Sequence, residues 1–271
     1  MTFGEIRMLS EEPDYRSPSG GAEIRLLLDF PQGAIAHAVT KPGETSEPAI
    51  LDGITEMFYV LGGSGQLWRG VGETEQVVTL RPGRLTTTPA GVQFQYSVAP
   101  DATEALRFLV VSAPRWERKR WQHAPTGYFN SDRTDTLTVD QPGAYRWRTH
   151  DLRYHVDYLA PDGSEIRLLD EVEEGGVAHC SLPAGATSQA VKHKTVAEIW
   201  YCASGFGRIA RRSPAGDWEV RSLCAGVAVS IPVGVEFQFQ ATGERLELIL
   251  GTFPHWPGAD EAMAVGPYWS P

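Results

Sequence analysis

The chain has 271 residues and a formal net charge of −10, with 42% hydrophobic and 21% charged residues. This length suits two domains of about 120–130 residues, each large enough to bury a core. The negative charge argues against a nucleic-acid groove, because phosphate contacts need clustered lysine and arginine. No run of about 18 apolar residues occurs, so we expect no membrane-spanning helix and no membrane partner.

The N-terminal stretch MTFGEIRMLSEEPDYR has no apolar core flanked by positive charge, so we expect no signal peptide. Three cysteines, Cys180, Cys202 and Cys224, are widely spaced and form no CxxC pair. This spacing disfavours a disulfide scaffold and a structural zinc ribbon. The expectation is a soluble, cytoplasmic protein.

Along the chain, short β-branched or aromatic runs alternate with Gly, Pro and Asp. In the first half these runs cover residues 23–28, 34–40, 56–61, 65–70, 76–83, 94–98 and 106–112. In the second half they cover residues 165–169, 177–182, 198–203, 207–212, 218–226, 227–232, 237–241 and 246–251. Many short strands separated by regular turns predict an all-β sandwich or closed barrel.

The second half of the chain repeats the first. A constant offset of 142 positions relates the pairs Glu23/Glu165, Arg25/Arg167, His37/His179, Gly43/Gly185, Glu56/Glu198 and Gly65/Gly207. With a small shift of register, PAGVQFQY (89–96) matches PVGVEFQF (232–239), and the match ends at APRWE (113–117) and FPHWP (253–257). Such agreement indicates two copies of one domain.

We therefore expect an N-terminal domain over 1–123, a linker or covering segment over 124–150, and a C-terminal domain over 151–271. The middle segment is polar and punctuated by Pro and Gly. Its aromatic residues suggest an additional strand or a cover for one of the domains: Tyr128, Phe129, Tyr145 and Trp147.

Each copy resembles a cupin, a small jelly-roll barrel, and the whole chain resembles a bicupin. The first family motif is a glycine, two histidines one residue apart, a glutamate and a glycine turn. Residues 41–65 and 183–207 both have this frame. The second motif is a Pro-x-Gly turn before a histidine, and TPAGVQF (88–94) and IPVGVEF (231–237) have the turn. The resemblance implies two tandem jelly-roll barrels.

In the family, the motif histidines and glutamate hold a divalent metal inside the barrel, with open positions for substrate or dioxygen. In copy one these positions are Ala49, Leu51, Glu56 and Phe94. In copy two they are Val191, His193, Glu198 and Phe237. We expect no metal cofactor. The alternative is a divalent metal in the C-terminal barrel, held by His193 and Glu198 with a third ligand from His179, Gln238 or Cys202.

A barrel interior remains a common place for a ligand even when metal ligands are missing. Phenylalanines at both final motif positions make the wall aromatic, and a carboxyl group in such surroundings has a raised pKa. His193 and Glu198 are the expected catalytic residues, as an acid–base pair within hydrogen-bonding reach. The expected ligand-binding residues are Glu56, Phe94, Trp200, Phe237 and His179, and His179 is instead a packing residue if it faces outward.

Three functions remain open for this chain. The first is a small-molecule-binding bicupin with metal-independent acid–base chemistry, such as isomerisation, cyclisation or a lyase reaction. The second is a metal-dependent dioxygenase or isomerase with its site in the C-terminal barrel. The third is a non-catalytic ligand-binding protein. A monomer is expected in solution, with a homodimer as the alternative.

Overall fold

The computed structural model describes residues 3–132, 136–140 and 147–270. The chain divides into two compact units. The first, called the N-terminal barrel below, comprises Ser10–Leu26 and Gly33–Asp151. The second, called the C-terminal barrel, comprises Met1–Leu9, Leu27–Gln32 and Leu152–Pro271. The described residues contain only two short 3-10 helices, η1 (Arg118–Arg120) and η2 (Ala259–Glu261), which confirms the all-β prediction.

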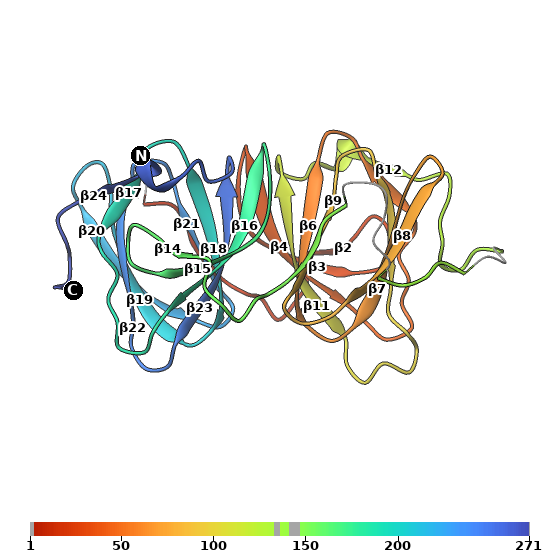
Figure 1. Cartoon of the computed structure of the whole chain (residues 1–271), viewed down its shortest axis with the longest axis horizontal. Coiled ribbons are helices and arrows are strands. Elements are labelled where there is room, and N and C mark those ends of the chain that lie inside the picture. Colours follow the sequence, from red (N-terminus) through yellow and green to blue (C-terminus); the bar gives the residue numbers. More distant parts are fainter. Residues whose placement is uncertain (1–2, 133–135, 141–146, 271) are drawn as a thin grey trace. The chain divides into compact units, whose positions relative to one another are not determined.

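Two antiparallel sheets form the N-terminal barrel (Figure 1). The seven-stranded sheet has the order β13 (Thr149–Asp151), β9 (Arg84–Thr88), β6 (Thr55–Gly62), β11 (Leu106–Ala113), β4 (Gly33–Thr40), β3 (Glu23–Phe30) and β2 (Tyr15–Arg16). The five-stranded sheet has the order β12 (Trp121–His123), β5 (Ala49–Leu51), β10 (Gln93–Ser97), β7 (Gly65–Val71) and β8 (Thr74–Leu80).

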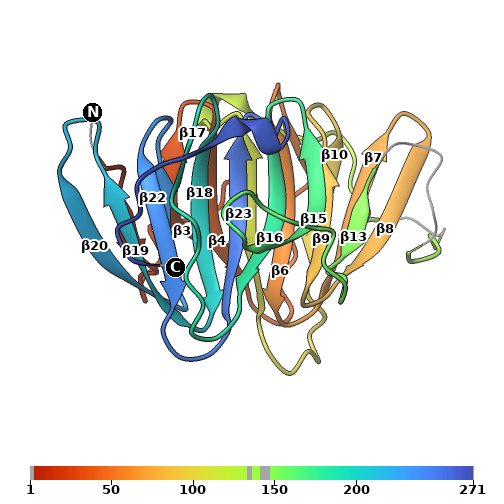
Figure 2. The same cartoon turned by 60° about the vertical axis from the view of Figure 1, so that its left-hand side comes forward.

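The C-terminal barrel has the same arrangement. Its seven-stranded sheet has the order β1 (Ile6–Met8), β21 (Val227–Ile231), β18 (Ala197–Ser204), β23 (Leu246–Phe253), β16 (Gly175–Leu182), β15 (Glu165–Val172) and β14 (Tyr158–Leu159). Its five-stranded sheet has the order β20 (Trp218–Cys224), β19 (Phe206–Arg212), β22 (Glu236–Ala241), β17 (Val191–His193) and β24 (Ala262–Ala264). Figure 2 shows β18, β23 and β16 side by side in this order.

The central strands follow from their sequence. AEIWYCAS, which forms β18, is buried at its first six residues, as expected for a strand covered on both faces. Side-chain alternation then decides which residues face the barrel interior. Trp200 and Cys202 belong to the hydrophobic core of the C-terminal barrel, and Glu198 lies on the same face of the strand.

The Pro-x-Gly turns that resemble the second family motif lead into β10 and β22. Their glycines, Gly91 and Gly234, have φ angles of +77° and +79°. Only glycine adopts this left-handed region without a steric penalty from a Cβ atom. The turns therefore set the chain direction so that Phe94 and Phe237, three residues later, enter the barrels.

The duplication extends further toward the N-terminus than the sequence match does. β1 pairs with β21 in the C-terminal barrel, and β13 pairs with β9 in the N-terminal barrel. β1 precedes the Asp14–Tyr15 pair of copy one, and β13 precedes the equivalent pair of copy two. Each copy thus begins with a strand that belongs to the unit formed mostly by the other copy.

A fully buried arginine holds this added strand in each barrel. Arg211 donates hydrogen bonds from Nη1 to the carbonyl oxygens of Ser230 at 2.7 Å and Glu5 at 3.3 Å, and it forms an ion pair with Glu219. Arg69 donates to Thr149 Oγ1 at 3.1 Å, and its guanidinium lies 5.6 Å from the centre of the Trp147 ring. Charge-assisted hydrogen bonds of this kind satisfy backbone groups that the strand brings into the barrel.

The repeat also continues toward the C-terminus of each copy. In the N-terminal barrel, the amides of Tyr128 and Phe129 donate to Gln95 Oε1 at 2.9 and 2.8 Å. In the C-terminal barrel, the amides of Tyr268 and Trp269 donate to Gln238 Oε1 at the same two distances. Part of the segment 124–150 therefore repeats the end of the chain. Tyr145 lies outside the described residues.

Gln238 serves as a clamp, because its Nε2 also donates to the carbonyl oxygens of Ser188 at 2.8 Å and Trp269 at 3.0 Å. Gln238→Ala leaves these backbone groups unpaired, which costs roughly 2–4 kcal/mol. We expect amide hydrogen exchange at Tyr268 and Trp269 to accelerate by about 30- to 1,000-fold. Gln240→Ala is the control, since its side chain contacts Arg208 and Thr187 instead. Equal effects of the two substitutions would contradict the clamp.

In the described part of the chain, no helix is long and apolar enough to cross a membrane.

Candidate functional site

The family motif positions of copy two meet inside the C-terminal barrel. Val191 on β17 pairs with Phe237 on β22, and Glu198 on β18 pairs with Thr252 on β23. His193 ends β17, and all four motif residues are buried. The strands therefore bring together the residues that the sequence identified as candidates.

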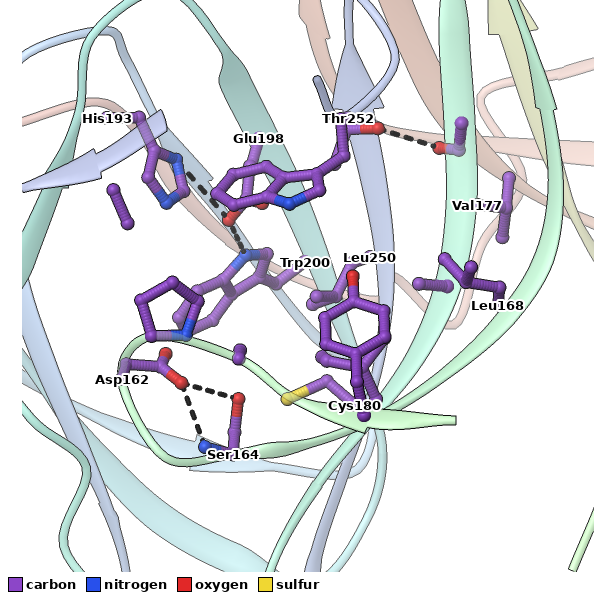
Figure 3. A pocket seen from close by; sticks show the side chains of 18 of the residues that line it. Asp162, Ser164, Leu168, Val177, Cys180, His193, Glu198, Trp200, Leu250 and Thr252 are labelled. Carbon is purple, nitrogen blue, oxygen red and sulfur yellow. Dashed lines mark hydrogen bonds and ion pairs between the residues drawn. The ribbon is translucent and has the colours of Figure 1, made fainter. Parts of the chain in front are cut away.

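A cavity of about 60 Å³ lies in front of Glu198 and His193 (Figure 3). It has room for a few water molecules, since one needs about 10–15 Å³. Leu168 and Tyr158 line it and are partly exposed at the surface of this barrel, so the cavity opens past these two side chains. Its size fits a small organic molecule of only a few non-hydrogen atoms.

Glu198 is only 4% exposed. Its Oε2 accepts a hydrogen bond of 2.7 Å from Trp200 Nε1, which fixes the carboxyl group. Burial raises the pKa of Glu198 above its ordinary value, against smaller lowering effects of His193 and the Trp200 hydrogen bond. The group therefore takes up and releases a proton at a higher pH than an exposed glutamate does.

His193 faces Glu198 without touching it. Its Nδ1 lies 3.9 Å from Glu198 Oε2, which is too far for the direct hydrogen bond that the sequence suggested. This nitrogen is buried and has no hydrogen-bond partner among the described residues. The rings of Phe237 and Trp256 pack edge-on against the imidazole at centroid distances of 5.2 and 5.0 Å. The imidazole is thus held by aromatic packing, with its nitrogen available to a ligand.

Asp162 is a site residue that the sequence analysis missed. It lines the same cavity and is 8% exposed. Its Oδ1 accepts hydrogen bonds from Ser164 Oγ at 2.7 Å and Ser164 N at 2.9 Å, and Figure 3 shows its other oxygen pointing away from Ser164. Burial raises the pKa of this carboxyl group as well. No motif marks this residue, and copy one has Ser19 at the equivalent turn position.

Two further polar groups line the cavity. Burial raises the pKa of the Cys180 thiol strongly, so this cysteine stays protonated and is a poor nucleophile. Thr252 Oγ1 donates a long hydrogen bond of 3.5 Å to the carbonyl oxygen of Gly176. In copy one the equivalent residues are Ala38 and Ser112, so the thiol occurs in copy two alone, while a hydroxyl group stands beside the motif glutamate in both copies.

Aromatic rings pack together around the equivalent region of the N-terminal barrel. Phe58 lies 5.9 Å from Phe94 and 5.7 Å from Phe108, and Tyr96 lies 5.8 Å from Phe108. In copy two Leu248 replaces Phe108, so the equivalent aromatic cluster has one ring fewer. Aromatic rings therefore fill the part of the N-terminal barrel beside its motif positions.

Glu56 occupies the motif glutamate position of this aromatic core. It is 7% exposed, and burial raises its pKa to about 8. Leu51 stands where copy two has His193, so the carboxyl group has no imidazole beside it. Glu56 and Phe94, both predicted to bind a ligand, thus lie in a different barrel from the cavity described above.

His179 does not line the cavity. It lies on β16 between Ala178 and Cys180, which do, so strand alternation turns its side chain to the other face. Burial lowers the pKa of His179, Arg167 lowers it further, and Glu247 raises it. The side-chain amide of Gln238 already forms hydrogen bonds with the backbone of Ser188, Tyr268 and Trp269. Cys202 lies in the hydrophobic core. None of the three proposed third ligands joins His193 and Glu198.

The residues of the C-terminal cavity do not fit a resident metal of the family type. Val191 and Phe237 offer no donor atom, and Glu198 Oε2 already accepts the Trp200 hydrogen bond. Within residues 3–132, 136–140 and 147–270, no group of three or more His, Cys, Asp or Glu side chains is arranged to hold a metal ion. Transition-metal sites in proteins use several such ligands at once.

No protein-family model and no curated protein matches the chain. Among solved structures, it is similar to oxalate decarboxylase from Bacillus subtilis, with a TM-score of 0.71 and 17% identity over 98% of this chain and 79% of that chain. The coconut allergen cocosin gives 0.69 and 14% over 96% and 87%. Procruciferin, an 11S globulin from Brassica napus, gives 0.67 and 13% over 96% and 86%. These likenesses confirm the fold.

Proposed function

Starting from the bicupin fold of the chain and the buried Glu198–His193 pair in its C-terminal cavity, we propose that this barrel is an acid–base enzyme. It binds a small organic molecule and moves a proton to or from one of its carbon atoms. Isomerisation, cyclisation and elimination all contain such a step. The observation that carries this proposal is the separation of 3.9 Å between His193 Nδ1 and Glu198 Oε2 at the wall of the cavity.

The two groups have complementary roles in proton transfer. The raised pKa of Glu198 lets its carboxyl group donate a proton closer to neutral pH than an exposed glutamate can. The Trp200 hydrogen bond holds one carboxyl oxygen. The imidazole of His193 is the partner group, because its Nδ1 has a lone pair or a proton to exchange and lies 3.9 Å from Glu198 Oε2 at the cavity wall.

The surroundings support this chemistry. Aromatic and aliphatic side chains form most of the cavity wall and exclude bulk water, which strengthens electrostatic interactions with a bound molecule. The asymmetry between the copies also supports it, since copy one has Leu51 and Ser19 in place of His193 and Asp162. If both barrels bound the same ligand, the same side chains would be expected at these positions in both copies.

The activity named for oxalate decarboxylase does not suit this cavity. Its lining includes the buried carboxyl residues Asp162 and Glu198, and no lysine or arginine from the described residues. A dianion such as oxalate would lie beside these carboxyl groups without a compensating positive side chain. The shared fold therefore supports a related architecture with a different substrate.

A deuterium-exchange assay tests the proposed proton transfer. The protein is incubated in D₂O with hydroxyacetone, aminoacetone or pyruvate, three small ketones of different charge whose C–H groups are acidic. We expect exchange at carbon well above the buffer rate for at least one of them, measured by proton NMR. Binding without exchange for all three would contradict catalysis and support a non-catalytic ligand-binding protein.

A further inference from the structure

Two buried carboxyl residues, Asp162 and Glu198, line the C-terminal cavity together with the imidazole of His193. The described residues that line the cavity include no lysine or arginine. Buried carboxyl groups are usually paired with a cation, because desolvation of an unpaired charge is costly. Here the described residues that line the cavity supply no permanent cation.

The aromatic wall of the cavity has the chemistry of a cation site. Tyr158, Trp200, Phe237, Phe239 and Trp256 all line it. The faces of aromatic rings attract organic cations, and rings combined with carboxylates are the usual surroundings of bound ammonium groups. Trp200 is held in place by its hydrogen bond to Glu198, and the Phe237 and Trp256 rings are fixed against His193.

The unpaired imidazole nitrogen shows where a ligand atom fits. His193 Nδ1 is buried without a hydrogen-bond partner among the described residues, and Glu198 Oε2 is 3.9 Å away. A ligand group placed between these two atoms can contact both side chains at once. The outer oxygen of Asp162 is on the opposite side of the same space (Figure 3).

From these observations we propose that the ligand of the C-terminal cavity is a small organic cation, a primary or methylated ammonium compound with a few carbon atoms. This inference rests on the proposed function of the same cavity. Asp162, whose Oδ1 is fixed by Ser164, holds the ammonium group. Glu198 and His193 then face the carbon atom next to it, where the proton is transferred.

Calorimetry with a matched set of probes tests the proposal. Propylammonium, propan-1-ol and propionate have nearly the same size and differ in charge. At constant ionic strength we expect propylammonium to bind at least about tenfold more tightly than propan-1-ol. One additional charge-assisted hydrogen bond contributes an affinity difference of this size. We expect no measurable binding of propionate.

Asp162→Asn tests the assigned contact. This substitution keeps the size of the side chain and removes its charge, so we expect propylammonium to bind roughly 10- to 100-fold more weakly. Binding of propan-1-ol should change by less than about twofold, since a neutral ligand makes no ion pair with Asp162. Ser19→Ala, at the equivalent turn of the N-terminal barrel, is the matched control and should bind like the unmodified protein.

The outcomes separate this inference from the proposed function. Suppose that propan-1-ol or propionate binds as tightly as propylammonium, and that Glu198→Gln weakens that binding. The proposed positive charge of the ligand is then wrong, while the cavity remains the ligand site. If none of the three binds and no ketone exchanges deuterium, both proposals fail. The selectivity of the unmodified protein decides the matter even if Asp162→Asn does not fold.

Discussion

Replacing Glu198 by glutamine is expected to slow deuterium exchange into the responsive ketone by roughly 10²- to 10⁴-fold, the usual contribution of one positioned acid–base group. Glutamine keeps the size of the side chain and can still accept the Trp200 hydrogen bond through its amide oxygen. The loss would therefore reflect the missing proton. His193→Ala is expected to cause a loss of the same order, since it removes the partner group of the same step.

The matched control for this prediction is Glu56→Gln, which makes the same change at the equivalent position of the N-terminal barrel. It should leave the exchange rate within about twofold of the unmodified protein, since Glu56 has no polar partner group at position 51. Exchange rates are measured by NMR on variants whose circular dichroism matches the unmodified protein. A larger loss for Glu56→Gln than for Glu198→Gln would place the chemistry in the other barrel.

Glu56 is instead expected to control how the N-terminal barrel responds to pH. Its pKa is about 8 in the folded protein and about 4.5 when exposed. The folded state thus holds a proton that the unfolded state has released between these values. Stability from this group is complete below pH 4.5, decreases as pH rises and is lowest above pH 8, by up to about 5 kcal/mol. Glu56→Gln should remove this decrease.

Urea unfolding at pH 5, 7 and 9 measures the effect, with hydrogen exchange in β6 and β11 reporting on the N-terminal barrel itself. The difference in unfolding free energy between Glu56→Gln and the unmodified protein should shift in favour of the variant with increasing pH. Glu73→Gln, a change at an exposed position, should show no such trend. A pH-independent difference for Glu56→Gln would mean that this carboxyl group has the same pKa in the folded and unfolded protein, which would contradict the prediction.

The fold was predictable because it is recorded twice in the sequence. Strand-length runs, Pro-x-Gly turns and a constant offset such as Glu56 to Glu198 all indicate the same domain in each half. The added strands were not predictable, because the sequences of β1 (IRM) and β13 (THD) are not similar. Their equivalence is recognised from the buried arginine that contacts each strand. The buried Arg69 and Arg211, also 142 positions apart, are a trace of that contact in the sequence.

The site was predictable where it follows the family frame and not elsewhere. His193, Glu198, Trp200 and Phe237 do lie together, because motif spacing and strand alternation fix their positions. Asp162 comes from a turn about thirty residues earlier, and only the folded barrel brings it to the cavity. The role of Gln238 was hidden for the same reason, since its partners are backbone groups that carry no residue-specific signal.

The central claim is that the side chains of the C-terminal barrel carry out proton transfer by themselves. The most direct test is deuterium exchange by protein purified without an affinity tag, dialysed against a chelator and analysed for metal content. We expect the exchange rate to stay unchanged when iron, manganese, nickel and zinc are each far below one equivalent. Loss of exchange on dialysis and its recovery with one equivalent of a divalent metal would contradict the claim.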